Sequence, residues 1–178
     1  MGGEERLRRV REEMGLMERI LSYIPGYRGY KERELRRESD RLVRMEAVNR
    51  LRAAKDTLRK NLTNPYVVQR ISSEDAWRIE TLMSRLDRVV QRIDRAVAGY
   101  AGMFDSIKVR EDKLDAVLQH DLSLIEKADS LKASAEALVK IEVGREEWKR
   151  GIEDLIARTD ELDALVDRRV EIFRGLTS

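Results

Sequence analysis

Apolar residues recur at spacings of three and four along most of this chain, and Arg, Lys, Glu and Asp occupy most of the positions between them. This spacing places the apolar side chains on one face of an α-helix. It predicts a short helix over residues 4–22 and long helices over 31–62, 74–101 and 106–174. The clearest run alternates spacings of three and four, as in a heptad repeat; it consists of Ile79, Leu82, Leu86, Val89, Ile93, Val97, Tyr100 and Phe104.

Proline and capping residues mark the predicted helix boundaries. Pro25 ends the first helix because its nitrogen carries no hydrogen to donate within a helix. Asn64 and Pro65 end the helix that begins at residue 31. Ser73 is the predicted N-cap of the next helix, and Asp105 that of the last.

The pattern Gly-Tyr-x-Gly interrupts the helical pattern twice, at residues 26–29 and 99–102. Glycine permits positive φ, and tyrosine rings can cover the end of a helical core, so both copies are interpreted as corners of a bundle. Because one long helix runs away from the first corner and the next runs back to the second, we expect both corners at one end. The corner residues are Gly26, Gly29, Gly99, Tyr100, Gly102 and Phe104.

The first corner is also a candidate for binding a partner. Tyr and Arg are favoured at binding hot spots, and they also contact phosphates, bases and membrane interfaces. The candidate residues are Tyr23, Tyr27, Arg28 and Tyr30.

The last helix is predicted to continue through Gly144. No capping residue follows this glycine at once, and Ile141 and Trp148 are separated by one heptad. A hairpin at Gly144 is the alternative.

These elements predict an all-α fold: one elongated domain spanning residues 1–178, built as an antiparallel three-helix bundle or coiled coil with one very long C-terminal helix. The second half of that helix would lack a cover, which either the N-terminal helix or a second copy of the chain could supply. We therefore expect a homodimer or higher oligomer. The self-association residues are Trp148, Ile152, Leu155, Leu162, Val166 and Phe173.

The charge distribution is asymmetric. Charged residues make up 39% of the 178 residues and aromatic residues only 5%, which is typical of long helices with narrow apolar stripes. Residues 1–60 hold 17 Lys and Arg against 11 Asp and Glu, whereas residues 111–178 hold 11 against 17. The two ends could therefore attract each other, within one chain or between two.

The sequence shows no recognisable catalytic motif. It has no cysteine and one histidine, His120, which cannot supply the paired histidines of a di-metal bundle. His120 is interpreted as lying at the surface or at the edge of the apolar stripe. A phosphate-binding loop is absent from the sequence, and no cofactor, metal site or enzymatic activity is predicted. Because the sequence has no secretory signal and no apolar run of membrane-spanning length, we expect a cytoplasmic protein.

The favoured function is a non-enzymatic helical scaffold or adaptor that self-associates and binds a protein partner. The alternative is a peripheral membrane-associated coiled-coil protein that binds anionic lipid through its basic N-terminal third. Nucleic-acid binding is less favoured because basic and acidic residues are interleaved.

Overall fold

The computed structural model describes the backbone of residues 15–26, 32–96 and 111–177, and the side chains of residues 15–26, 39–96 and 116–172. These residues form helices joined by turns, with no strand among them, which confirms the predicted all-α class. The helices are α2 (Glu32–Leu62), α3 (Pro65–Val68), α4 (Ser73–Asp94), α6 (Glu111–Leu138) and α7 (Glu146–Thr177). Residues 15–22 form a further helical segment.

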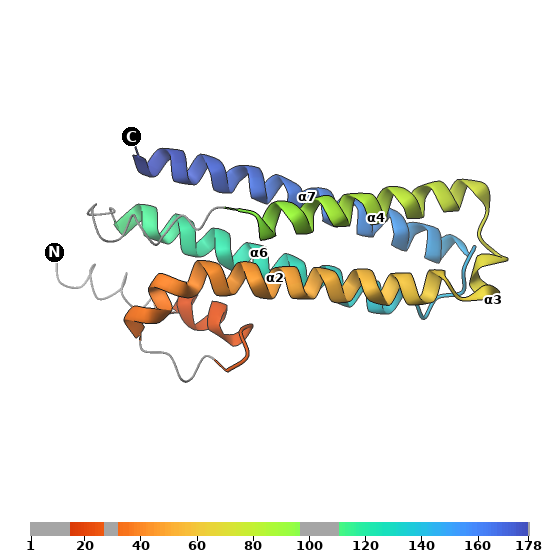
Figure 1. Ribbon diagram of the computed structural model, residues 1–178, viewed down its shortest axis with the longest axis horizontal. Helices are drawn as coiled ribbons and strands as arrows, with labels where there is room; N and C mark the ends of the chain where they lie inside the picture. Colours follow the sequence, from red (N-terminus) through yellow and green to blue (C-terminus); the bar gives the residue numbers. More distant parts are fainter. Residues whose placement is uncertain (1–14, 27–31, 97–110, 178) are drawn as a thin grey trace.

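The four long helices lie side by side as a bundle (Figure 1). Helix α2 packs against α4 and α6, and α7 packs against the same two helices. Helices α4 and α6 therefore occupy diagonal positions, as do α2 and α7. Helix α3 and the turn between α6 and α7 lie together at one end of the bundle, which we call the closed end (Figure 1).

The predicted continuous helix over residues 106–174 is interrupted at the closed end. Helix α6 ends at Leu138 and α7 begins at Glu146, and Gly144 between them has φ of +87°. This is the hairpin alternative, and glycine suits it because L side chains rarely adopt positive φ. The turn contains residues 139–145, a length of chain equal to about two turns of an α-helix. The apolar residues Ile141 and Trp148 therefore keep heptad spacing in the sequence, although the chain reverses direction in space between α6 and α7.

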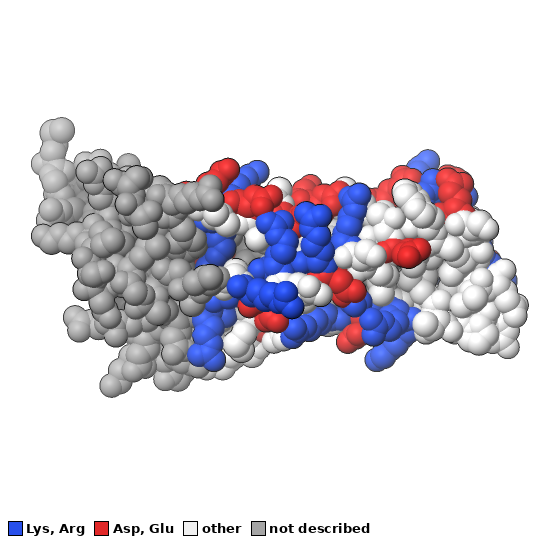
Figure 2. All heavy atoms as spheres, turned by 45° about the horizontal axis from the view of Figure 1, so that its top comes forward, with Lys and Arg blue, Asp and Glu red and all other residues white. Residues whose placement is uncertain are grey.

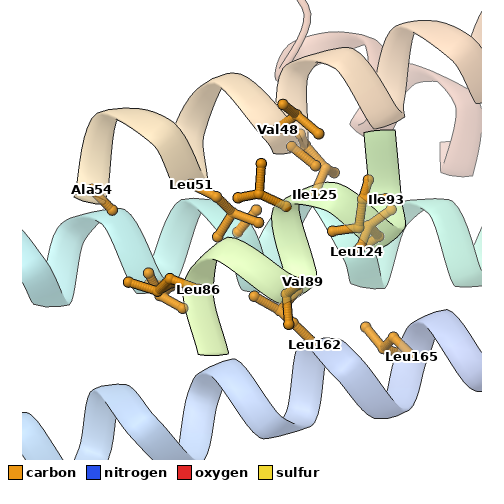
Figure 3. Close-up of a cluster of buried hydrophobic side chains, with 14 of the residues drawn as sticks. Val48, Leu51, Ala54, Leu86, Val89, Ile93, Leu124, Ile125, Leu162 and Leu165 are labelled. Carbon is orange, nitrogen blue, oxygen red and sulfur yellow. The ribbon is translucent and has the colours of Figure 1, made fainter. Parts of the chain in front are cut away.

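One apolar core runs through the bundle and receives side chains from every long helix. Figure 3 shows its central part, where Leu51 of α2, Leu86 of α4 and Ile125 of α6 converge, with Leu162 of α7 beside them. In the N-terminal segment, Ile20 and Ile24 are also buried in this core. That segment contacts α6 through an ion pair between Arg19 and Glu126, whose closest atoms are 2.7 Å apart.

The predicted self-association stripe is part of this internal core. Trp148 is 1% exposed, and the other described members are also buried: Ile152, Leu155, Leu162 and Val166. The side chain of Phe173 lies outside the described residues. Because α7 folds back between α4 and α6, the premise that its apolar face lacks a cover is wrong.

The opposite charges of the chain meet within one molecule. Arg50 of α2 pairs with Asp129 of α6. Along the contact between α4 and α7, Arg88 lies 2.5 Å from Asp163, and Arg92 contacts both Asp163 and Asp167. The hydrogen bond to Asp167 raises the pKa of Arg92. Many of the charged residues that could have attracted a second chain therefore form ion pairs within this one.

Side-chain caps fix where helices begin at the closed end. The hydroxyl of Ser72 accepts a hydrogen bond from the Asp75 nitrogen at 3.1 Å, so the N-cap of α4 is one residue earlier than the predicted Ser73. Asn64 caps α3 by accepting from the Tyr66 nitrogen at 3.0 Å. Pro65 follows at the first helical position, where its missing N–H is not needed.

Candidate functional site

One candidate site is a hollow of about 360 Å³ at the closed end, between α3 and the α6–α7 turn. We call it the tip hollow. Its apolar wall comes from Tyr66, Val67, Val139, Ile141 and Val143. Its polar rim comes from Asn61, Arg70, Lys140 and Glu142. Apolar and polar groups share the lining, so the hollow can receive an apolar group of a partner together with a polar one.

Local sequence explains why Tyr66 stands at the edge of the tip hollow. The Asn64 cap and Pro65 start a helix of only four residues, which places Tyr66 in its first turn. The tyrosine side chain remains 82% exposed. A large aromatic residue left in water beside a hollow is a favourable contact for a partner, because its burial removes apolar surface from solvent.

Polar contacts hold the two sides of the tip hollow together. The Asn61 side-chain nitrogen donates to the Val139 carbonyl at 3.5 Å, and the Arg70 guanidinium contacts the Glu142 carboxylate at 2.9 Å. Arg145 binds the same carboxylate from within the turn at 2.7 Å. The two walls are thus joined independently of any partner, and the hollow is preformed.

Exposed apolar side chains are concentrated near this end. Tyr66, Val68 and Trp77 are three of the five large hydrophobic residues that are exposed in the described part of the chain. Trp77 lies in the second turn of α4 and is 67% exposed. The other two exposed residues, Met45 and Val170, belong to α2 and α7.

A second unusual feature is a cluster of charged side chains inside the bundle, distant from the tip hollow along α2, α6 and α7. We call it the buried ion cluster; it contains Asp40, Arg44, Asp121 and Arg169. Arg169 of α7 bonds to Asp40 of α2 and lies 3.4 Å from Asp121 of α6. Arg44 contacts the other oxygen of Asp40 at 3.3 Å. Burial raises the pKa of the Asp121 carboxyl above its ordinary value, while the adjacent His120 opposes that rise.

His120 borders this cluster and is buried, so of its two predicted places the surface one is wrong. Its Nε2 atom is 2.7 Å from the carbonyl oxygen of Leu165. Since a carbonyl only accepts, the ring nitrogen is the donor in this bond. Arg44 makes a similar link by donating to the Ala96 carbonyl at 2.6 Å. The cluster therefore ties the four long helices together through charged and backbone groups.

Of the predicted partner-binding residues, the structure describes Tyr23. Its ring is half-buried against the core. The guanidinium carbon of Arg50 lies 5.6 Å from the ring centroid, within cation–π range. Arg50 also donates to the Tyr23 carbonyl at 2.9 Å. Tyr23 thus serves a structural contact between the N-terminal segment and α2.

Most of the repeated Gly-Tyr-x-Gly pattern lies outside the described residues. Gly26 is described, with φ of +76°. This value is in the left-handed region that glycine adopts readily. The expected meeting of both corners at one end stays a prediction. The undescribed residues are Tyr27, Arg28, Gly29, Tyr30, Gly99, Tyr100, Gly102 and Phe104.

The sequence contained an indication of the buried ion cluster, because charged residues occupy positions of the apolar stripe. Asp121 lies three residues after Leu118 and four before Ile125, which is a core position. Arg169 likewise follows Val166 by three. The tip hollow had no comparable signal, because its two walls come from segments far apart in the sequence.

Among the described residues, no group of three or more His, Asp or Glu side chains is arranged to hold a metal ion. In the same part of the chain, none of the helices combines the length and apolarity that a bilayer crossing requires. Comparisons of the sequence with protein-family models and curated proteins, and of the structure with solved structures, found no match.

Proposed function

We propose that this protein is a helical scaffold or adaptor without enzymatic activity that binds a protein partner at the tip hollow. The observation that carries the proposal is the exposed ring of Tyr66 beside a preformed hollow that is lined partly by valine and isoleucine side chains. An apolar side chain of the partner would enter between Val67 and Val143 and cover the tyrosine ring. Anchors of this kind dominate the energetics of many protein interfaces.

Polar groups at the rim would orient the partner. Lys140 is exposed and has no ionic partner among the described residues, while Arg70 is held by Glu142. A carboxylate in the partner, next to the inserted side chain, could pair with Lys140. Contacts of this kind contribute more to specificity than to affinity.

Site-directed photocrosslinking in the native cells tests the proposal. A photoreactive phenylalanine derivative in place of Tyr66 is expected to yield an adduct of defined mass that requires ultraviolet light. The matched control carries the same group at Ala133, an exposed position of α6. The substitution Val143→Glu places a charge in the hollow and should abolish the Tyr66 adduct without changing the helical circular dichroism. Absence of a Tyr66 adduct, or the same adducts from both positions, would refute the proposal.

Self-association would need a different surface from the one that the sequence indicated, because the described side chains of that stripe are internal. Sedimentation velocity over a range of concentrations measures it directly. A strict monomer at high concentration would remove self-association from the proposed function and leave the adaptor role to the tip hollow.

Membrane binding through the basic N-terminal third finds less support. Within residues 39–60, Arg44, Arg50, Arg52 and Lys55 all contact carboxylates of the same chain. The described part of this third is therefore less basic at its surface than its sequence indicates.

A further inference from the structure

A short N-terminal segment covers one side of the four long helices. These helices already form a ring, since α2 and α7 each pack against both α4 and α6. Figure 1 shows residues 15–26 outside this ring, beside the N-terminal half of α2. Ile20 is nevertheless 0% exposed, and Leu21 and Ile24 are each 7% exposed. The segment therefore buries its apolar side chains against the side of a ring that is complete without it, and we call residues 15–26 the strap.

The strap covers an additional apolar side of α6, next to α2. Leu118 and Leu122, one helical turn apart, are buried there at 5% and 1% exposure. Ala133 follows Leu122 by about three helical turns and so lies on the same side of α6, yet it is exposed. This side of the helix is therefore covered in its N-terminal half and open further along. Glu126, one turn after Leu122, pairs with Arg19 of the strap at 2.7 Å, which places the strap over the covered half. We call the surface beneath it the strap groove.

The strap is held by weaker polar contacts than the ring. The Arg19 and Glu126 side chains are 61% and 37% exposed, so water screens their ion pair and it contributes little to stability. Figure 2 shows that basic and acidic side chains lie side by side over the middle of one face of the bundle. The contact between α4 and α7 alone has three ion pairs, in addition to the apolar core: Arg85 with Asp160, Arg88 with Asp163 and Arg92 with Asp167. Detaching the strap therefore breaks far fewer contacts than opening the ring.

Arg50 of α2 keeps ionic partners whether or not the strap is attached. It donates to the Tyr23 carbonyl of the strap at 2.9 Å, but it also pairs with Asp129 of α6 and, at 3.1 Å, with Glu46 of its own helix. The Tyr23 ring lies over the guanidinium, with its centroid 5.6 Å from the central carbon. In the described part of the chain the Arg50 Nε atom is buried without a hydrogen-bond partner, which is unfavourable because the donor has lost its water. Detachment of the strap would return this donor to water and leave no charge unpaired.

We propose that the strap is an autoinhibitory cover, which detaches from the strap groove as a unit while the four-helix ring stays folded. Segments with few buried contacts open at a lower free energy than the rest of a protein. Pro25 ends the helix of the strap, so the strap is not continuous with α2. Once uncovered, the groove fits an amphipathic helix with apolar side chains at the spacing of Ile20, Leu21 and Ile24. The attached strap excludes such a helix. This site is separate from the tip hollow, which lies at the closed end.

Thiol labelling of the full chain tests whether the strap groove opens. The chain has no cysteine, so a substituted one is its single thiol. Leu122→Cys places the thiol beneath the strap, and the matched control Leu131→Cys places it in the core of the ring, where Leu131 is 0% exposed. We expect Leu122→Cys to react with an aromatic disulfide reagent about tenfold faster than Leu131→Cys, or more, because opening of the strap is enough to expose it.

The substitution Ile20→Ala weakens the strap without touching the ring. Truncating a fully buried isoleucine should favour opening by about 30-fold or more, so Leu122→Cys should label faster by that factor while Leu131→Cys labels as before. Ile152→Ala removes the same atoms from the ring core, at a side chain that is 1% exposed. It should accelerate the labelling of Leu131→Cys instead.

A fluorescent peptide with the sequence of residues 15–26 probes the uncovered groove. The full-length variant Ile20→Asp/Ile24→Asp cannot bury its own strap without burying two charges, so its groove should be open. It should bind the peptide about tenfold more tightly than the wild type, or more, because the wild-type strap competes from within the same chain. The same peptide carrying both aspartates should bind neither protein.

Hydrogen exchange of the wild-type chain needs no substitution in the groove. The amides of Ile20 and Leu21 should be less protected than those of Leu51 and Leu131, which lie in ring helices. Four results would overturn the proposal. They are equal labelling rates of the two cysteine variants, equal acceleration of both by Ile20→Ala, equal affinity of the peptide for the wild type and the aspartate variant, and equal protection of the strap and ring amides. Each of the four would show that the strap and the ring open as one cooperative unit or that the groove accepts no second helix.

Discussion

The substitution Arg169→Met would test how far the buried ion cluster stabilises the bundle. Arg169 is 5% exposed, and its guanidinium contacts the carboxylates of both Asp40 and Asp121. Methionine approximates the length of the arginine side chain but removes the charge. It would leave two buried carboxylates, of which Asp40 keeps its contact with Arg44 and Asp121 keeps His120 nearby.

The size of the effect follows from the desolvation of the remaining charges. Removing one partner of a buried ion pair destabilises a protein by about 3–5 kcal/mol, because the other charge stays out of water. For a chain of this size, each kcal/mol lowers Tm by about 2–4 °C, so the expected decrease is about 6–20 °C. The same substitution at Arg85 breaks an exposed pair with Asp160, for which a loss of at most about 1 kcal/mol is expected.

Urea unfolding followed by circular dichroism would measure both variants. The double variant Arg169→Met/Asp121→Asn should recover part of the loss, because the amide removes one uncompensated charge; a coupling of about 1 kcal/mol or more is expected for residues in contact. If Arg169→Met destabilised the protein no more than Arg85→Met, the cluster would not be a stabilising element and the desolvation argument would be wrong.

Three further predictions concern single residues. The folded-state pKa of Asp121 is raised, so its protonation stabilises the wild type at low pH, and this stability is lost as pH rises from the unfolded value of 3.8 through the folded value. Asp121→Asn does not titrate and should therefore gain stability relative to the wild type as pH rises. Urea unfolding between about pH 4 and pH 8 tests this, and a constant difference in unfolding free energy between the two proteins contradicts it. Gly144→Ala should destabilise the chain by about 1–2 kcal/mol, since a left-handed backbone conformation is strained for any residue with a Cβ. Gly15→Ala, in a helical segment with open space around it, should instead be neutral or stabilising. Thermal unfolding compares the two variants, and equal effects on Tm would contradict the requirement for positive φ at Gly144. Trp148→Ala should lower the free energy of unfolding by about 3–5 kcal/mol at every protein concentration, as measured by denaturation curves. A loss of stability that is confined to dilute samples would indicate that Trp148 lies at an intermolecular contact instead.

Much of the secondary structure follows from sequence because helix formation depends on local spacing. The predicted helix over 31–62 matches α2 within one residue, and the helix predicted to begin at 74 begins at Ser73. The N-terminal helix is described over residues 15–22, where the predicted end at 22 holds. Periodicity could not decide between a straight helix and a hairpin at Gly144, because the turn over residues 139–145 preserves the heptad register on both sides.

The candidate site was less accessible to sequence reasoning than the helices. Tyr66 and Val143 belong to segments far apart in the chain, and only the reversal at Gly144 brings them to the same hollow. The exposure of Trp77 could have been anticipated, since it falls outside the apolar run that begins at Ile79.

The sequence by itself determined the helical class, most helix boundaries and the alternation of charge, because each depends on residues within one or two turns of one another. The tertiary structure decided which faces meet. It placed Trp148 in the core instead of at an interface, moved His120 inside, and joined Asp40 to Arg169 across 129 positions of the chain. An apolar stripe in a sequence shows that one face of a helix will be buried, but it does not show which surface will cover it, since burial against any apolar surface is favourable to a similar degree. In this chain a single glycine turn, which folds α7 back onto α4 and α6, supplies the cover from within the molecule.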